Sequence, residues 1–303
     1  MIKDILESQR KAPQLLVENK ISFAAADSEL GIYDTFEQAS RIKLVSDQLL
    51  FCGMVTGKKV IHAHNNAFEC EFLPHESFVM APNSPIEIDF PTASITQPTT
   101  CLAVEISTER VNKVVNGLNA DTPLLNYGKD WQYDANLVHT HHNGQTQALL
   151  NRIVQIYTEN HQDRSFMIDL AVTELIVRLL RHQTREFLIA HSSAQPDHSG
   201  LNAVVSYIRD NLHENLNIDD LCKLACMSRT KFFAQFKQLL GCTPNDFLYQ
   251  LRLKEAAQLL KSGETITSIC FATGYANTSH FSRSFKSFYG MSPSHYRNRQ
   301  AIN

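Results

Sequence analysis

The sequence lacks any apolar run that approaches the ~20 residues a helix needs to cross a bilayer. It also lacks a hydrophobic stretch near its start, where MIKDILESQRKAPQLL places acidic and polar residues instead of the core of a secretory signal. We therefore expect neither a membrane protein nor a secreted one. Its 303 residues leave room for two domains with a core each, and 43% hydrophobic with 19% charged residues is ordinary for a globular chain.

The cysteines form no C-x-x-C pair and are odd in number. Disulfide frameworks and common zinc sites use paired cysteines, so this pattern favours reduced thiols in the cytoplasm. Each free thiol is then either a small buried hydrophobe or a redox sensor, and both readings stay open. The seven cysteines are Cys52, Cys70, Cys101, Cys222, Cys226, Cys242 and Cys270.

Acidic residues are scarce in the last third of the chain. From residue 200 onward there are 12 Lys and Arg against 7 Asp and Glu, a net charge of +5, whereas the rest of the chain carries −8. A basic segment joined to an acidic one indicates that the C-terminal part meets a polyanion such as nucleic acid.

The chain before this basic part divides into a β-rich and a helical region. Short alternating runs over 42–106 are typical of strands, and we expect a small antiparallel β-barrel over about 20–106. Apolar residues at helical spacing predict helices over about 107–190, which either pack on the barrel or form a dimer interface. HSSAQPDHSG, at 191–200, is rich in Ser, Pro, Gly and His and predicts a linker.

After the linker the pattern is helical, and one unit occurs twice. KFFAQFKQLLGCTPNDF, at 231–247, and HFSRSFKSFYGMSPSHY, at 280–296, share two phenylalanines, a lysine, a glycine, a proline and a final aromatic residue. Each copy is typical of a short helix, a tight turn and a second helix ended by glycine, the pattern of a helix-turn-helix. The units are predicted at about 218–240 and 266–289.

The predicted fold class is therefore α+β. An N-terminal domain over 1–190, with a small antiparallel β-barrel and helices of its own, precedes an all-α domain over 201–303. In the all-α domain a long helix over 244–262 joins the two helix-turn-helix units.

Each second helix of the repeat has an apolar face and a polar face. Phe232, Phe236 and Leu240 in the first copy, and Phe281, Phe285 and Phe288 in the second, recur at helical spacing and are expected to point inward. The opposite faces carry small polar residues and cations without an acid. Such side chains suit a major groove, although a solvated face on two structural helices is the alternative. The predicted DNA-binding residues are Ser228, Arg229, Thr230, Lys231, Phe233, Ala234, Lys237, Asn277, Thr278, Ser279, Ser282, Arg283 and Lys286.

These residues stand in a run of motifs that resembles the AraC/XylS family of bacterial transcriptional regulators. Cys222 and Cys270 stand where the family most often has Ala. Phe233 and Ala234 are apolar where a polar base reader is frequent, which favours contacts with thymine methyl groups or a positioning role. The matching motifs are I-x-x-L-C-x-x-A-C-M-S at 218–228, F-K-x-x-x-G-x-x-P at 236–244, L-R-L-K-x-A-x-x-L-L at 251–260, I-x-x-I-C-x-x-x-G-Y at 266–275 and S-H-F-S-R-x-F-K-x-x-x-G-x-S-P-x-x-Y-R at 279–297.

The resemblance implies a DNA-binding regulator, usually an activator that touches RNA polymerase, and not an enzyme with a cofactor. Two recognition helices would enter successive major grooves of promoter DNA, about 34 Å apart on one face. The resemblance also implies a cytoplasmic protein, associated with the nucleoid when bound to DNA, that forms a homodimer. Its N-terminal domain would bind a small-molecule or protein effector.

The β-rich region resembles the cupin-like domains of this family and raises a different possibility. His62, His64 and Glu69 follow the H-x-H-x4-E spacing of metal-binding cupins, in which two imidazoles and a carboxylate hold iron or manganese. His75 and Glu76 stand where such barrels have glycine, and we expect no metal. The alternative is a cupin-type metalloenzyme fused to a DNA-binding module. Three further histidines, in what we expect to be a polar loop, are either metal ligands or solvated: His139, His141 and His142.

Overall fold

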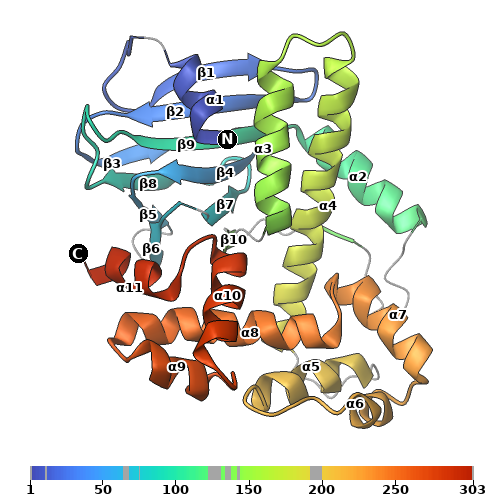
Figure 1. Ribbon diagram of the computed structural model, residues 1–303. Coiled ribbons are helices and arrows are strands. Elements are labelled where there is room, and N and C mark those ends of the chain that lie inside the picture. The colour runs from blue at the N-terminus through green and yellow to red at the C-terminus, as the bar shows by residue number, and fades with distance from the viewer. Residues whose placement is uncertain are drawn as a thin grey trace. The chain divides into compact units, whose positions relative to one another are not determined.

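The chain forms two compact units in this computed structural model (Figure 1). The first comprises Met1–Gly117 and Tyr133–Val177, and the second comprises Leu118–Gln132 and Arg178–Asn303. The predicted linker falls largely outside the described residues, so the domain boundaries stay predictions. The structure describes residues 2–10, 12–63, 68–74, 76–121, 131–133, 138–141, 144–191 and 200–301.

The first unit contains antiparallel strands that pair as two sheets among the described residues. One sheet has the order β1-β2-β9-β4-β7-β10 and the other β3-β8-β5-β6. The antiparallel β domain of the predicted fold class is thereby confirmed, while closure into a cupin-like barrel stays a prediction. The strands are β1 (Asn19–Ala24), β2 (Ser28–Thr35), β3 (Ala39–Leu44), β4 (Leu49–Thr56), β5 (Lys59–Ala63), β6 (Phe68–Phe72), β7 (Glu76–Met80), β8 (Ile86–Phe90), β9 (Thr99–Ile106) and β10 (Val138–His141).

An apolar core lies between the two sheets. Strand β8 shows why, because Ile86, Ile88 and Phe90 are buried while the acidic residues between them are not. Successive side chains of a strand point to opposite faces, so the sequence IEIDF supplies one apolar row to the core. Residues from β4, β7 and β9 of the other sheet, such as Cys52 and Phe78, complete the same cluster.

Helices accompany the larger sheet in the first unit. Tyr157 of α3 meets Ser28 of β2 through a hydroxyl–hydroxyl hydrogen bond of 2.5 Å, and helix α1 packs against α3. Helix α3 also lies against β4, since a Cβ on Gly53 would be 3.6 Å from the Leu150 side chain, and the β4 residues from Leu49 to Met54 are all buried. The helices are α1 (Ile2–Gln9), α2 (Thr108–Asp121), α3 (Gly144–Thr158) and α4 (Arg164–His191), of which α4 begins in this unit.

Strand β10 corrects one expectation. We expected a polar loop around His139 and His141, but Val138–His141 pairs antiparallel with β7, from Val138 opposite Val79 to His141 opposite Glu76. The segment is too short and too polar to show a strand pattern by itself, and its pairing partner lies about sixty residues earlier in the chain. His142 lies outside the described residues.

The helices of the second unit begin and end where local sequence signals place them. Thr243 and Asp246 form a reciprocal capping box at the start of α8, and Gly241 ends α7 in the left-handed conformation at φ 72°. Gly290 ends α10 in the same way at φ 73°. The elements are α5 (Gly200–Asp210), α6 (Ile218–Leu224), α7 (Arg229–Leu240), α8 (Pro244–Leu259) followed by a 3₁₀ turn (Leu260–Ser262), α9 (Ile266–Ala272), α10 (Thr278–Tyr289) and α11 (Pro293–Ala301).

The two copies of the repeat build similar aromatic cores. Phe232 and Phe236 are fully buried in the first, and Phe281 and Phe285 are fully buried in the second. One expected member differs, since Phe288 is half-buried and Tyr289 takes the buried position beside Phe285. The all-α domain of the predicted fold class is confirmed. Within the described residues, no helix has both the length and the apolar character that crossing a membrane requires.

Candidate nucleic-acid interface

Helix α7 exposes the residues predicted for the first recognition helix. Thr230, Ala234 and Lys237 are exposed on the side opposite Phe232 and Phe236. Phe233 is half-buried, and its ring meets the ring of Phe232 edge to face at 5.7 Å. The face therefore offers a cation, a hydroxyl and apolar surface, which suits phosphate contact and the methyl group of thymine.

Helix α10 exposes a more polar face. Ser279, Arg283 and Lys286 are exposed, while Thr278 and Ser282 are half-buried beside them. The Arg283 Nε donates to the carbonyl oxygen of Ser279 at 3.3 Å, which leaves the other guanidinium nitrogens for a ligand. A guanidinium can pair with two acceptors of a guanine edge, whereas a hydroxyl reaches either a base or a phosphate.

Two residues of the predicted set cap the recognition helices. The Ser228 side chain accepts a hydrogen bond from the backbone N–H of Lys231 at the start of α7. The Asn277 side chain accepts one from the N–H of His280 at 2.7 Å at the start of α10. Because both oxygens already accept from the backbone, these residues position the helix starts as well as lying on the exposed side.

The remaining predicted residues, Arg229 and Lys231, are exposed at the start of α7. Arg229 lies 3.5 Å from the carboxylate of Asp219, and both side chains are largely exposed. Such a surface pair is weak and exchanges readily for another anion.

His280, the third residue of α10, is not among the residues predicted from the sequence. Its side chain is exposed, and its ring packs near the rings of Tyr249 and Tyr275, with centroids 6.0 and 5.5 Å away. The signal was present, because the S-H-F-S-R motif places this imidazole next to Ser279 at the same helix start. We add His280 to the residues on the exposed side of α10.

Two of the candidate metal residues, His62 and Glu69, lie in the described part of the chain. The His62 Nε2 lies 2.9 Å from the Asp89 carboxylate and its Nδ1 lies 3.2 Å from the Glu69 carboxylate, so the two acids face opposite sides of the ring. His64 lies outside the described residues. In the part of the chain that the structure describes, no group of three His, Cys, Asp or Glu side chains could hold a metal ion.

The interior of the first unit contains a buried lysine, Lys59, that the sequence did not reveal. The Lys59 Nζ donates to the Glu18 carboxylate at 2.9 Å and lies 3.0 Å from the Cys101 sulfur and 4.8 Å from the Phe90 ring centroid. Burial lowers the pKa of Lys59, but Cys101 and Glu18 outweigh that effect, so the pKa is raised and the ammonium stays charged. Burial also raises the pKa of the Cys101 thiol.

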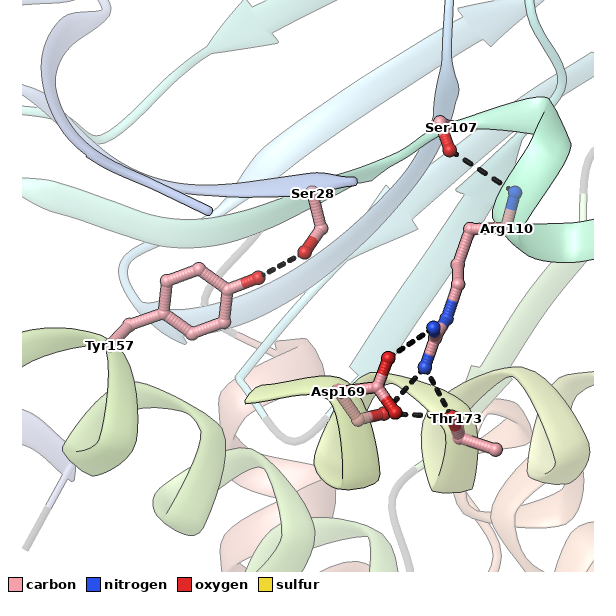
Figure 2. Close-up of polar contacts among 6 residues, drawn as sticks. All are labelled: Ser28, Ser107, Arg110, Tyr157, Asp169 and Thr173. Atoms are coloured by element: carbon pink, nitrogen blue, oxygen red, sulfur yellow. Dashed lines mark hydrogen bonds and ion pairs between the residues drawn. The ribbon is translucent and has the colours of Figure 1, made fainter. Parts of the chain in front are cut away.

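Helices α2 and α4 of the first unit are joined by a buried arginine (Figure 2). Arg110 bonds the carboxylate of Asp169, donates to the Asp169 carbonyl oxygen at 2.7 Å and donates to the hydroxyl of Thr173. The pKa of Asp169 is lowered, chiefly by its hydrogen bond with Arg110. Ser107 caps α2 by accepting from the Arg110 N–H at 3.1 Å.

Two helix-turn-helix units with basic exposed faces define a DNA-binding protein of the helix-turn-helix class. Residues 221–299 match the family described as a helix-turn-helix domain. Residues 28–187, more than half of the chain, match the family described as the AraC-type transcriptional regulator N-terminus. The chain belongs to the AraC family of transcriptional regulators. Members of this family are not enzymes, so the alternative of a fused metalloenzyme has no support.

Curated relatives are similar in sequence to this chain over part of their length. The chain is 33% identical over 152 residues to an uncharacterized HTH-type transcriptional regulator of Haemophilus influenzae, covering 49% of this chain and 51% of that protein. It is 31% identical over 145 residues to the raffinose operon regulatory protein RafR of Pediococcus pentosaceus, covering 47% and 52%. It is 25% identical over 172 residues to the activator RhaS of Escherichia fergusonii, covering 56% and 58%. The chain thus spans about half the length of the curated relatives it matches.

Two solved structures are also similar to the chain. A single-residue variant of apo ToxT from Vibrio cholerae is 18% identical, and the match covers 90% of this chain and 97% of that one at a TM-score of 0.40. An AraC-type DNA-binding domain from Chromobacterium violaceum, 32% identical, covers 34% of this chain and 92% of its own at a TM-score of 0.32.

Proposed function

We propose that this protein regulates transcription by reading two successive major grooves with helices α7 and α10. The observation that carries the proposal is the pair of exposed faces, which present Arg, Lys, Ser and Thr without an acidic side chain among the predicted positions. Cations on such a face neutralise DNA phosphates, and side chains of this kind reach base edges. The names of the curated relatives, which are regulators and activators of transcription, support the same function.

Helices α7 and α10 are proposed to make different contacts with DNA, because their exposed side chains differ. Arg283 is proposed to read a guanine edge, and Lys237 and Lys286 are proposed to take phosphates from their respective helices. Phe233 and Ala234 offer apolar contact to thymine methyl groups. Because α10 would make the more specific base contacts, the block of base pairs that it reads should tolerate fewer substitutions than the block that α7 reads.

The first unit is proposed to set the output. It is a folded β domain distinct from the helix-turn-helix units, and we propose that it binds a small-molecule or protein effector. The regulator is proposed to act as an activator, as the relative RhaS is described to be, and we propose that it does so by touching RNA polymerase. Because its partner is promoter DNA, we place it in the bacterial cytoplasm, at the nucleoid when bound.

A homodimer is proposed to form through helix α4. Phe166 and Leu170 lie one turn apart on this helix, and their side chains are 65% and 51% exposed. Two large apolar side chains at that spacing form a stripe that a second copy could cover. A dimer would bring four recognition helices to one promoter.

The function is tested by selecting genomic fragments with the full-length protein and measuring affinity for them against salt. Regulators of this kind should enrich a motif with two blocks one helical turn apart, and the affinity should fall steeply with salt. Failure to enrich any fragment, with and without cell extract as a source of effector, would contradict the proposal.

A further inference from the structure

The two helix-turn-helix units differ at one equivalent turn position. Cys226 follows α6 and Gly274 follows α9, and both adopt the left-handed conformation, at φ 53° and 76°. Their backbone hydrogen bonds match, because each N–H donates at 3.0 Å to a carbonyl near the end of the preceding helix. Cys226 is exposed and carries its side chain without obstruction by the fold. The turn of the first helix-turn-helix unit therefore tolerates a side chain at this position.

Gly274 has no room for a side chain. A Cβ placed there would lie 2.8 Å from the Arg252 Nη2 and 3.0 Å from the Cα of His213. Both distances are shorter than ordinary carbon contacts, so glycine is required here by a neighbour as well as by φ. The turn at Gly274 is thus in tight contact with Arg252 and with the segment that follows α5. The turn at Cys226 leaves its side chain exposed.

Arg252, on the joining helix α8, holds that arrangement. Its side chain is buried, with the residue 3% exposed, and its guanidinium donates to three backbone carbonyl oxygens. Charge-assisted hydrogen bonds of this kind are stronger than neutral ones, and the planar fork fixes their directions. The bonds run from Nε to Leu212 at 2.6 Å, from Nη2 to Glu214 at 2.9 Å and from Nη1 to Gly274 at 2.9 Å.

The contacts of Arg252 continue through α5 to the first helix-turn-helix unit. A Cβ at Gly200, the first residue of α5, would lie 2.4 Å from the carbonyl oxygen of Ala225, so α5 begins in tight contact with the first turn. The segment after α5 supplies two of the three carbonyl oxygens that Arg252 binds. The first turn, α5, Arg252 and the second turn therefore form one continuous path of contacts.

We propose that Arg252 is a positioning residue that fixes the two helix-turn-helix units relative to each other and so sets the spacing between the two blocks of base pairs. This inference rests on the proposed function. Each base pair added between the blocks moves the second groove by roughly 3.4 Å and turns it by about a tenth of a turn. A pair of units held at one geometry accepts one spacing, whereas a loosened pair accepts several.

The test is a selection from random-sequence DNA duplexes with the full-length wild type and Arg252→Lys. Lysine keeps the charge but cannot direct three bonds in a fixed fork. We expect the wild type to enrich two blocks at one spacing, and Arg252→Lys to enrich the same two blocks at several spacings. Affinity for the wild-type spacing should fall about tenfold, because preorganisation is lost. Arg297→Lys makes the same exchange on α11 and should leave the spacing unchanged.

The outcomes separate the two proposals. Two blocks at one unchanged spacing in Arg252→Lys would overturn the role of Arg252 and leave the proposed function standing. A wild-type selection without two blocks would overturn the proposed function, and this inference with it. If Arg252→Lys does not fold, Gly274→Ala pushes the same contact apart and should broaden the spacing, whereas Gly263→Ala, with φ 84° and open space around its Cβ, should not.

Discussion

Arg110 of α2 binds Asp169 of α4 at two points, the Asp169 carboxylate and the Asp169 backbone carbonyl oxygen. Arg110 is 4% exposed, so its charge is removed from most solvent, while the Asp169 side chain remains 47% exposed. The pair joins two helices of the first unit that are far apart in sequence. Its stabilising effect depends on the ionised form of Asp169.

Asp169→Asn should therefore change the pH dependence of stability. The native pKa of Asp169 is lowered from 3.8, so its contribution is present above that value and is lost as pH falls through the native pKa. Calorimetry should find the variant less stable by about 1 kcal/mol near neutral pH, a value reduced by the exposure of the carboxylate. The difference should shrink below pH 4. Thr173→Val removes a partner of Arg110 that does not titrate, and its deficit should stay constant with pH.

The contact between Arg252 and Gly274 predicts unequal effects of one substitution at two glycines. Gly263→Ala should cost about 1–2 kcal/mol for its left-handed backbone alone. Gly274→Ala should cost clearly more, because the new methyl group also meets Arg252 and His213. Trp131, which is the sole tryptophan and is buried in the same unit, can report urea unfolding by fluorescence. Equal losses would contradict the packing described.

Arg283→Ala should relax specificity at one or two base pairs in one block. A bidentate contact with guanine discriminates by about 1–3 kcal/mol, so the preference at that position should largely disappear. Competition binding against single-base substitutions of the selected site measures it. Arg209→Ala, on α5, should leave every preference intact, and unchanged preferences in Arg283→Ala would rule it out as a reader.

Lys237→Ala and Lys286→Ala should weaken binding to all sequences alike. Each loses one phosphate contact, so the slope of log affinity against log salt should flatten by roughly one unit per variant. Lys223→Ala is the control, because Lys223 pairs with Asp220 at 3.0 Å on α6 and lies outside the predicted face. If the salt slope flattened only in Lys223→Ala, the phosphate contact would belong to Lys223 and not to Lys237 or Lys286.

Leu170→Glu should weaken the proposed homodimer by about tenfold or more, because a charge would enter the apolar stripe of α4. Sedimentation velocity over a concentration series measures the dissociation constant. Ser165→Glu adds the same charge on an exposed position of the same helix and should leave it unchanged. Identical behaviour of both variants and the wild type would exclude this surface.

The helices of the repeat were predictable because their signals are local. Ser228 caps α7, Gly241 and Gly290 end α7 and α10, and the spacing of phenylalanines marks the buried side. Each signal acts within a turn or two of the chain, so the sequence alone carries it. The same holds for β8, whose alternation is complete within five residues.

What the sequence could not supply depends on contacts between distant segments. The carbonyl oxygens that bind Arg252 lie 22 to 40 residues away, and backbone carbonyl oxygens leave no mark on residue type. Strand β10 forms because β7 offers an edge, not because its own residues favour a strand. Lysine is a residue type that is usually exposed, and only the fold turns Lys59 inward toward Cys101.

Hydroxyl-radical footprinting of the full-length protein on a selected promoter fragment shows whether both helices enter DNA together. We expect two protected blocks on one face of the duplex, about one helical turn apart. A single protected block, or two blocks on opposite faces, would contradict it.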